Sequence, residues 1–204
     1  ADPYLGTEYL LEEWNNNDGG TGVLRLFTIT GAVGAETLTP GPYVLSPEPW
    51  ESSGPEAPQL GSTQTIDTGD SRIQSLLYRA GTLWSVQTVF LPVGKATHSA
   101  AQWWQIGTDG TTLQRSRLDD PGGATFYAYP SLAVNAHGDF TLGYSVFSAS
   151  THASAGSAYH AAGAPPDTLR DPALLQAGEQ AENNDNNHDL NKGKAFLVLH
   201  VQSP

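Results

Sequence analysis

The sequence predicts an all-β fold: a propeller-like array of four-stranded antiparallel blades, with a β-sandwich as the alternative. Residues 129–147 alternate apolar and polar side chains on either side of a turn at Gly138, which is typical of a β-hairpin. Residues 76–90 repeat this layout around Gly81. No stretch has a sustained helical period. A hairpin that recurs without helices between its copies indicates a repeat of small sheets.

The spacing of the repeat sets the size of its unit. Gly81 aligns with Gly138 and Phe90 with Phe147, an offset of 57 residues (138 − 81). A unit of this length has room for four strands, which is the content of a propeller blade. The chain of 204 residues holds three to four such units (204/57). Because this is a small number for a propeller, the sandwich stays open.

In chain order, the first strands are predicted at residues 9–14 and 23–30, where β-branched and aromatic residues are frequent. Residues 37–39 lead into a region with prolines at positions 40, 42, 47, 49, 55 and 58. Proline donates no hydrogen bond to a sheet. We therefore predict that residues 41–71 form a Pro-rich surface loop, held in place by Trp50.

From residue 72 onward, two complete units are predicted. The strands of the first unit are expected at residues 72–79, 82–91, 99–107 and 112–118. Those of the second unit are expected at residues 126–135, 140–148, 157–162 and 173–176. A polar loop at residues 180–193 and a terminal strand at residues 194–202 complete a single all-β domain, residues 1–204.

The composition limits the possible partners. With 21 acidic and 9 basic residues the net charge is −12, which disfavours nucleic acid and anionic membranes, because both require a basic surface. No apolar stretch is long enough to span a membrane. The chain contains no cysteine, so it has no disulfide, zinc–thiolate site or thiol nucleophile of its own. Together with a start at Ala1, this favours a secreted, extracellular protein whose signal peptide has been removed.

Three segments carry a resemblance to a known family. They begin with LLEEWNNNDGG (residues 10–20), SAAQWWQIGTDG (residues 99–110) and YPSLAVNAHGDF (residues 129–140). These segments resemble secreted bacterial proteins with a sialidase-like β-propeller, most of them without a characterised function. The resemblance implies the fold and extends to Glu179, after which the sequence departs from the next blade that the family pattern leads us to expect. It implies no particular reaction.

Two polar loops, at residues 15–20 and 182–189, are rich in the oxygen-bearing side chains that Ca²⁺ prefers. The predicted metal ligands are Asp18, Asn183, Asp185, Asn187 and Asp189. Neither loop has the spacing of an EF-hand, and turns stabilised by Asn and Asp side chains are the alternative interpretation. Ca²⁺ is therefore the one cofactor that we expect, and its absence is the alternative.

Two pairs of adjacent acids raise the question of glycosidase activity, which requires two carboxylates that face each other. The pairs are Glu12–Glu13 and Asp119–Asp120. Because adjacent residues of a strand point to opposite faces, neither pair is predicted to be catalytic. The chain has six arginines but no recognisable sialidase Asp-box. No catalytic residue is predicted.

Aromatic residues are the expected ligand-binding surface. Trp103, Trp104, Tyr127 and Tyr129 are predicted to form a platform for a glycan or a protein ligand. In the alternative interpretation they are core residues, because two consecutive tryptophans fit a strand whose sheet is covered on both faces.

The terminal strand is the expected interface. Its large apolar side chains, Phe196, Leu197, Val198 and Leu199, point to both faces of the strand. Such a strand at an open sheet edge favours pairing with another chain. We expect a homo-oligomer formed through the terminal strands, with residues 9–14 as the acceptor edge.

Three functions are compatible with these observations. The first is a non-catalytic binding or adhesion module on the propeller-like scaffold. The second is a self-assembling extracellular structural protein that forms filaments. The third is a carbohydrate-active hydrolase, which rests on analogy of fold alone.

Overall fold

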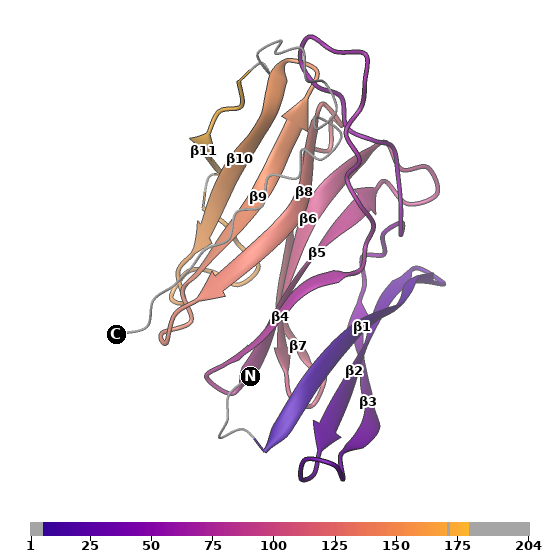
Figure 1. Ribbon diagram of the computed structural model, residues 1–204, viewed down its shortest axis with the longest axis vertical. Helices are drawn as coiled ribbons and strands as arrows, with labels where there is room; N and C mark the ends of the chain where they lie inside the picture. Colours follow the sequence, from indigo (N-terminus) through magenta and orange to yellow (C-terminus); the bar gives the residue numbers. More distant parts are fainter. Residues whose placement is uncertain (1–5, 171, 180–204) are drawn as a thin grey trace.

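The structure, a computed structural model, describes residues 6–170 and 172–179. This part of the chain contains eleven β-strands and no helix, and the strands form three antiparallel sheets (Figure 1). The prediction of an all-β chain is confirmed. Within the described residues, no helix is available that could cross a membrane.

The three sheets follow one another along the chain. The first sheet has the order β1 (Thr7–Asp18), β2 (Thr21–Thr30), β3 (Thr37–Ser46). The second has the order β4 (Ile73–Arg79), β5 (Thr82–Leu91), β6 (His98–Gly107), β7 (Thr112–Leu118). The third has the order β11 (Ala173–Gln176), β10 (Thr151–His160), β9 (Phe140–Ser148), β8 (Thr125–Val134). Consecutive strands are therefore neighbours in every sheet.

The second and third sheets contain the sequence repeat. Gly81 lies in the turn between β4 and β5, and Gly138 lies in the turn between β8 and β9. Both glycines have a positive φ, 82° and 86°, a conformation that turns require and that glycine adopts without strain. The two matching phenylalanines, Phe90 and Phe147, are both buried. The local pattern thus builds two sheets with the same strand order.

The first sheet differs from the prediction at its third strand. The sequence predicts a loop from residue 41, whereas β3 continues through Pro40 and Pro42 to Ser46. The strand tolerates both prolines because it pairs with β2 on one side only and its pairing is interrupted between Arg25 and Phe27. β10 also differs, since it begins at Thr151 and not at residue 157. Among its first six residues, Ala153, Ala155 and Gly156 are of types that are depleted in strands.

The segment after β3 connects the first sheet to the second. Trp50, near its start, is completely buried. The backbone N–H of Trp50 donates to the backbone carbonyl of Asn16 (3.0 Å), and the Asn16 side-chain amide donates to the backbone carbonyl of Trp50 (2.7 Å). Further along, Glu51 forms a β-bridge with Phe90. The segment is therefore bound to both sheets along its first residues.

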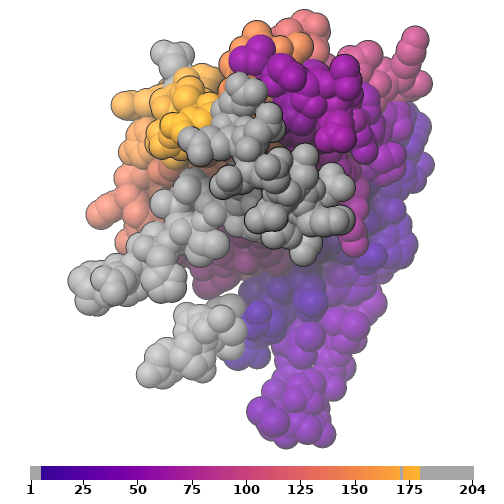
Figure 2. Space-filling model, turned by 45° about the horizontal axis from the view of Figure 1, so that its top comes forward, coloured from indigo at the N-terminus to yellow at the C-terminus, as the bar shows by residue number. Residues whose placement is uncertain are grey.

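Two hydrophobic cores hold the sheets together, one on each face of the second sheet. The first core joins the first and second sheets through Leu24, Leu26, Trp50, Leu83 and Trp104. The second core joins the second and third sheets through Trp84, Val86, Trp103, Phe140 and Leu142. Figure 2 shows the purple end of the first sheet projecting away from the orange residues of the third. The second sheet is therefore the middle layer of the molecule.

Candidate functional site

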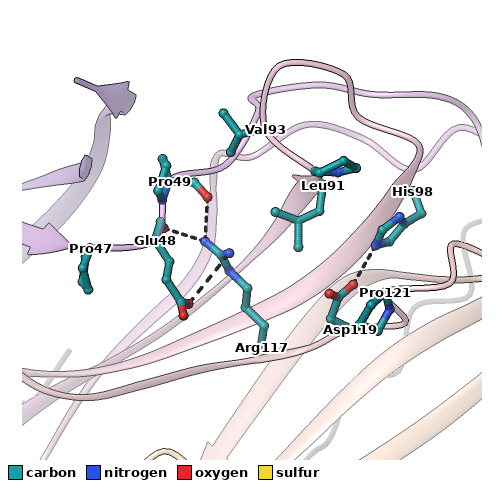
Figure 3. Close-up of a pocket in the computed structure, with 10 residues that line it drawn as sticks. Pro47, Glu48, Pro49, Leu91, Val93, His98, Arg117, Asp119 and Pro121 are labelled. Carbon is teal, nitrogen blue, oxygen red and sulfur yellow. Dashed lines mark hydrogen bonds and ion pairs between the residues drawn. The ribbon is translucent and has the colours of Figure 1, made fainter. Parts of the chain in front are cut away.

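A polar cleft lies where the segment after β3 meets β7 and the loop after β5 (Figure 3). It has a volume of about 460 Å³ and is lined by Pro47, Glu48, Leu91, His98, Arg117 and Asp119, among others. An adjoining hollow of about 610 Å³ shares Glu48 and Arg117 and continues to Arg115 and Asp167. A volume of a few hundred Å³ is ordinary for a small-molecule site.

Two arginines line these hollows: Arg117 lines both, and Arg115 lines the adjoining one. Arg115 and Arg117 are alternate residues of β7, so both side chains lie on the same face of the second sheet. Their side chains are only 9% and 13% exposed. Both donate to the side-chain oxygen of Gln102 on β6, Arg115 from Nη1 (2.9 Å) and Arg117 from Nε (2.6 Å). The Arg115 guanidinium also lies over the Trp104 ring, 5.5 Å from its centroid.

Glu48 is the carboxylate that these arginines bind. Its Oε2 accepts a hydrogen bond from Arg115 Nη2 and lies 3.9 Å from Arg117 Nη1. Arg117 Nη2 donates to the backbone carbonyls of Glu48 (2.6 Å) and Pro49 (3.0 Å). The Glu48 side chain is nevertheless 60% exposed. The arginines are therefore fixed by the protein, while the carboxylate between them faces the solvent.

The pKa values of Glu48 and Arg117 are both lowered, for different reasons. The hydrogen bond from Arg115 holds the pKa of the Glu48 carboxyl below its usual range. Burial, and then the positive charge of Arg115, lower the pKa of Arg117 to about 10. The negative charges of Glu48 and Asp119 oppose this shift, and Arg117 is still charged at neutral pH.

His98 and Asp119 form the opposite wall of the cleft, and Figure 3 shows them facing each other. His98 Nε2 lies 2.7 Å from Asp119 Oδ1, and His98 Nδ1 lies 3.1 Å from the Thr97 hydroxyl. The neighbouring Asp120 accepts backbone N–H bonds from Gly122 (3.0 Å) and Thr125 (2.8 Å). Asp119 and Asp120 therefore have separate structural partners and do not face each other as a catalytic pair.

The other predicted acid pair is separated by its strand. Glu12 is exposed on the outer face of β1, whereas Glu13 is half-buried on the inner face. The Glu13 carboxylate accepts a hydrogen bond from the Ser71 hydroxyl. The sequence argument that these acids point apart is confirmed.

Two of the predicted ligand-binding aromatics are inaccessible. Trp103 and Trp104 are both completely buried, which removes them from any glycan platform. They are core residues because each face of their strand is covered by another sheet. Tyr127 is half-buried against Tyr144, at 5.5 Å between ring centroids. Tyr129 lies elsewhere, with a positive φ of 52° and its hydroxyl 2.7 Å from the Asp67 carbonyl. The four residues do not form a common platform.

The predicted metal and interface residues are only partly within the described structure. Asp18 is exposed at the end of β1. Over residues 6–170 and 172–179, no three histidines or acids gather as they would around a metal ion. The remaining predicted residues lie outside the described ones: Asn183, Asp185, Asn187, Asp189, Phe196, Leu197, Val198 and Leu199.

The arginine-lined cleft is the feature that sequence reasoning missed. The alternation Arg115-Ser116-Arg117 indicates two cations on one face of a strand. Their partner Glu48 is 67 residues from Arg115 in the chain and inside the region predicted as a loop, so no local pattern joins them. Comparison of the chain with protein-family models, curated proteins and solved structures finds no match.

Proposed function

We propose that the chain is a secreted, non-catalytic binding module that holds an acidic sugar in the arginine-lined cleft. The observation that carries this proposal is the pair of buried guanidinium groups, Arg115 and Arg117, whose shared carboxylate Glu48 is exposed. A ligand carboxylate can take the place of Glu48 and receive the same hydrogen bonds. The Pro and Leu side chains of the cleft supply apolar contacts for a sugar ring.

The experiment compares two sugars and two variants. Glucuronic acid and glucose differ in the carboxylate and are titrated into the full chain by calorimetry. We expect glucuronic acid to bind and glucose to bind at least about tenfold more weakly, since a charge-assisted hydrogen bond contributes about 1.5–3 kcal/mol. Arg115→Gln should abolish this preference. Glu48→Gln should strengthen glucuronic acid binding, because it removes the competing carboxylate.

Thermal unfolding of each variant shows whether it is folded. Equal affinity for the two sugars, or a folded Arg115→Gln chain that binds as wild type, contradicts the proposal. An unchanged affinity in Glu48→Gln would show that the ligand does not compete for the arginines.

We further propose that the three sheets are blades of a propeller-like array. The stacking of the second sheet between the other two and the shared strand order of the second and third support this arrangement. The secreted location rests on the composition: the chain has no cysteine and a net charge of −12.

Self-assembly through the terminal strand is the second candidate function. It is favoured by the first sheet, which has three strands where the other two have four. Among the described strands, β1 pairs with β2 alone, so its other edge can accept a strand. Residues 194–202 are the proposed donor, although they lie outside the described residues. Deletion of residues 194–204 should reduce the mass measured by light scattering; an oligomer that keeps its mass contradicts this role.

A further inference from the structure

The outer face of the first sheet, which points away from the second sheet, carries an unusual number of exposed apolar side chains. They are Leu10 (41% exposed), Trp14 (49%), Leu38 (59%), Tyr43 (47%) and Leu45 (56%). The strand register explains the division between the faces, since Tyr9 and Leu11 on alternate positions pack into the first core. Large exposed apolar patches on a folded protein commonly mark an interaction surface.

Arg25 lies at the centre of this outer face. Its guanidinium is 4.7 Å from the ring centroids of both Trp14 and Tyr43, and 5.5 Å from that of Phe27. Its Nη1 donates to the Tyr43 hydroxyl (3.0 Å), while its Nε is buried without a hydrogen-bond partner. None of the carboxylates in the described part of the chain is within ion-pair distance of it. Trp, Tyr and Arg are the residues that dominate the energetics of protein interfaces.

The same face carries its own acids. Glu12 lies directly across from Arg25 in the strand register, and Glu8 lies across from Ile29. Both glutamates are exposed and form no ion pair within the described structure. Because an unpaired cation lies beside unpaired anions, this face is complementary in charge to the same face of a second copy. When two such faces meet around a two-fold axis, Arg25 of each copy can bind Glu12 of the other.

The size of the face is sufficient for a weak dimer. β2 and β3 each have ten residues. At about 3.4 Å per residue and about 4.8 Å between strands, three strands cover roughly 500 Å². Two copies together would bury about 1,000 Å², the lower limit for a specific interface.

We propose that two copies of this chain associate through the outer face of the first sheet, with reciprocal contacts between Arg25 and Glu12. This contact uses the face of β1 and not its edge, so it is independent of the terminal strand. It is also independent of the arginine-lined cleft, which lies outside the first sheet's outer face.

Sedimentation velocity of the full chain over a range of concentrations tests the proposal. We expect a reversible dimer with a dissociation constant in the micromolar range, which corresponds to a binding free energy on the order of −8 kcal/mol. Arg25→Glu and Glu12→Arg should each weaken it more than about tenfold, because each places like charges together. The double variant E12R/R25E should restore the dimer, since the pairs re-form with exchanged signs.

A second pair of variants tests the apolar part of the same face. Leu38→Glu introduces a charge on the outer face of the first sheet, and Leu174→Glu introduces one on the third sheet; both leucines are 59% exposed. The first variant should be monomeric and the second should dimerise as wild type. Melting curves show whether each variant is folded.

A wild-type chain that stays monomeric at every concentration overturns the proposal. So does a dimer that folded Arg25→Glu and Leu38→Glu leave intact, or that E12R/R25E fails to restore. Deletion of residues 194–204 should leave this dimer in place, and loss of the dimer on that deletion would assign association to the terminal strand instead.

Discussion

Trp103 and Trp104 are consecutive residues of β6, yet they are completely buried in two different hydrophobic cores. Trp104 contacts the Trp50 ring in the core with the first sheet, at 6.0 Å between centroids. Trp103 contacts Phe140 in the core with the third sheet, at 4.6 Å. One dipeptide therefore holds three sheets together.

Removal of either tryptophan should destabilise the whole fold. We expect Trp103→Ala and Trp104→Ala each to lower the free energy of unfolding by about 3–5 kcal/mol, because each leaves a large cavity. Denaturant unfolding followed by circular dichroism measures this. A variant as stable as the wild type would contradict this packing argument.

The close approach of Gly22 to Trp50 predicts a second sensitive position. A Cβ at Gly22 would lie 2.0 Å from Trp50 Cζ3, so the ring occupies the space of a side chain. Gly22→Ala should lower the free energy of unfolding by about 1–3 kcal/mol through overpacking. Gly163→Ala is the matched control, since a Cβ there has no neighbour within 4 Å. Equal stability of the two variants would contradict the packing argument.

The half-buried Glu13 predicts a specific pH dependence. Burial raises the pKa of its carboxyl above the ordinary value of 4.5, and the hydrogen bond from Ser71 opposes this shift only in part. As the pH rises above 4.5, the unfolded chain releases this proton before the folded chain does. The stability contributed by Glu13 is thus present below 4.5 and is lost as the pH rises through the higher, folded-state pKa.

Glu13→Gln isolates this effect, because glutamine can still accept the Ser71 hydrogen bond but does not titrate. The wild-type chain should lose stability relative to Glu13→Gln between pH 4.5 and neutral pH. Chemical unfolding at a series of pH values measures the difference. A difference that does not change with pH, or that changes in the opposite sense, would contradict the assignment.

Calcium binding at residues 15–20 and 182–189 stays a prediction, although residues 15–18 continue β1 instead of forming a loop. If Ca²⁺ binds only the folded chain, millimolar calcium should raise the melting temperature relative to a chelator, because ligand binding stabilises the state that binds. Asp18→Asn should reduce the increase if residues 15–20 contribute. Identical melting curves with calcium and with chelator would contradict calcium binding.

Much of the fold was accessible from local sequence patterns. The observed bounds of β5, β7, β9 and β11 coincide with the predicted strands at residues 82–91, 112–118, 140–148 and 173–176. These strands are marked by alternation and by turn residues, which act within a few positions of the chain. β3 was missed because proline is tolerated only at a sheet edge, and which strand is at an edge is not a local property.

The sequence by itself determined that the chain forms antiparallel hairpins around Gly81 and Gly138 and that its surface is acidic. The tertiary structure decided which side chains remain accessible. The stacking of sheets covered Trp103 and Trp104, and it left Arg25 half-buried between the exposed rings of Trp14 and Tyr43. It also brought Glu48 to Arg115, 67 residues away. The physical reason is that alternation along a strand is a short-range property, whereas burial and charge pairing depend on which sheet covers which face.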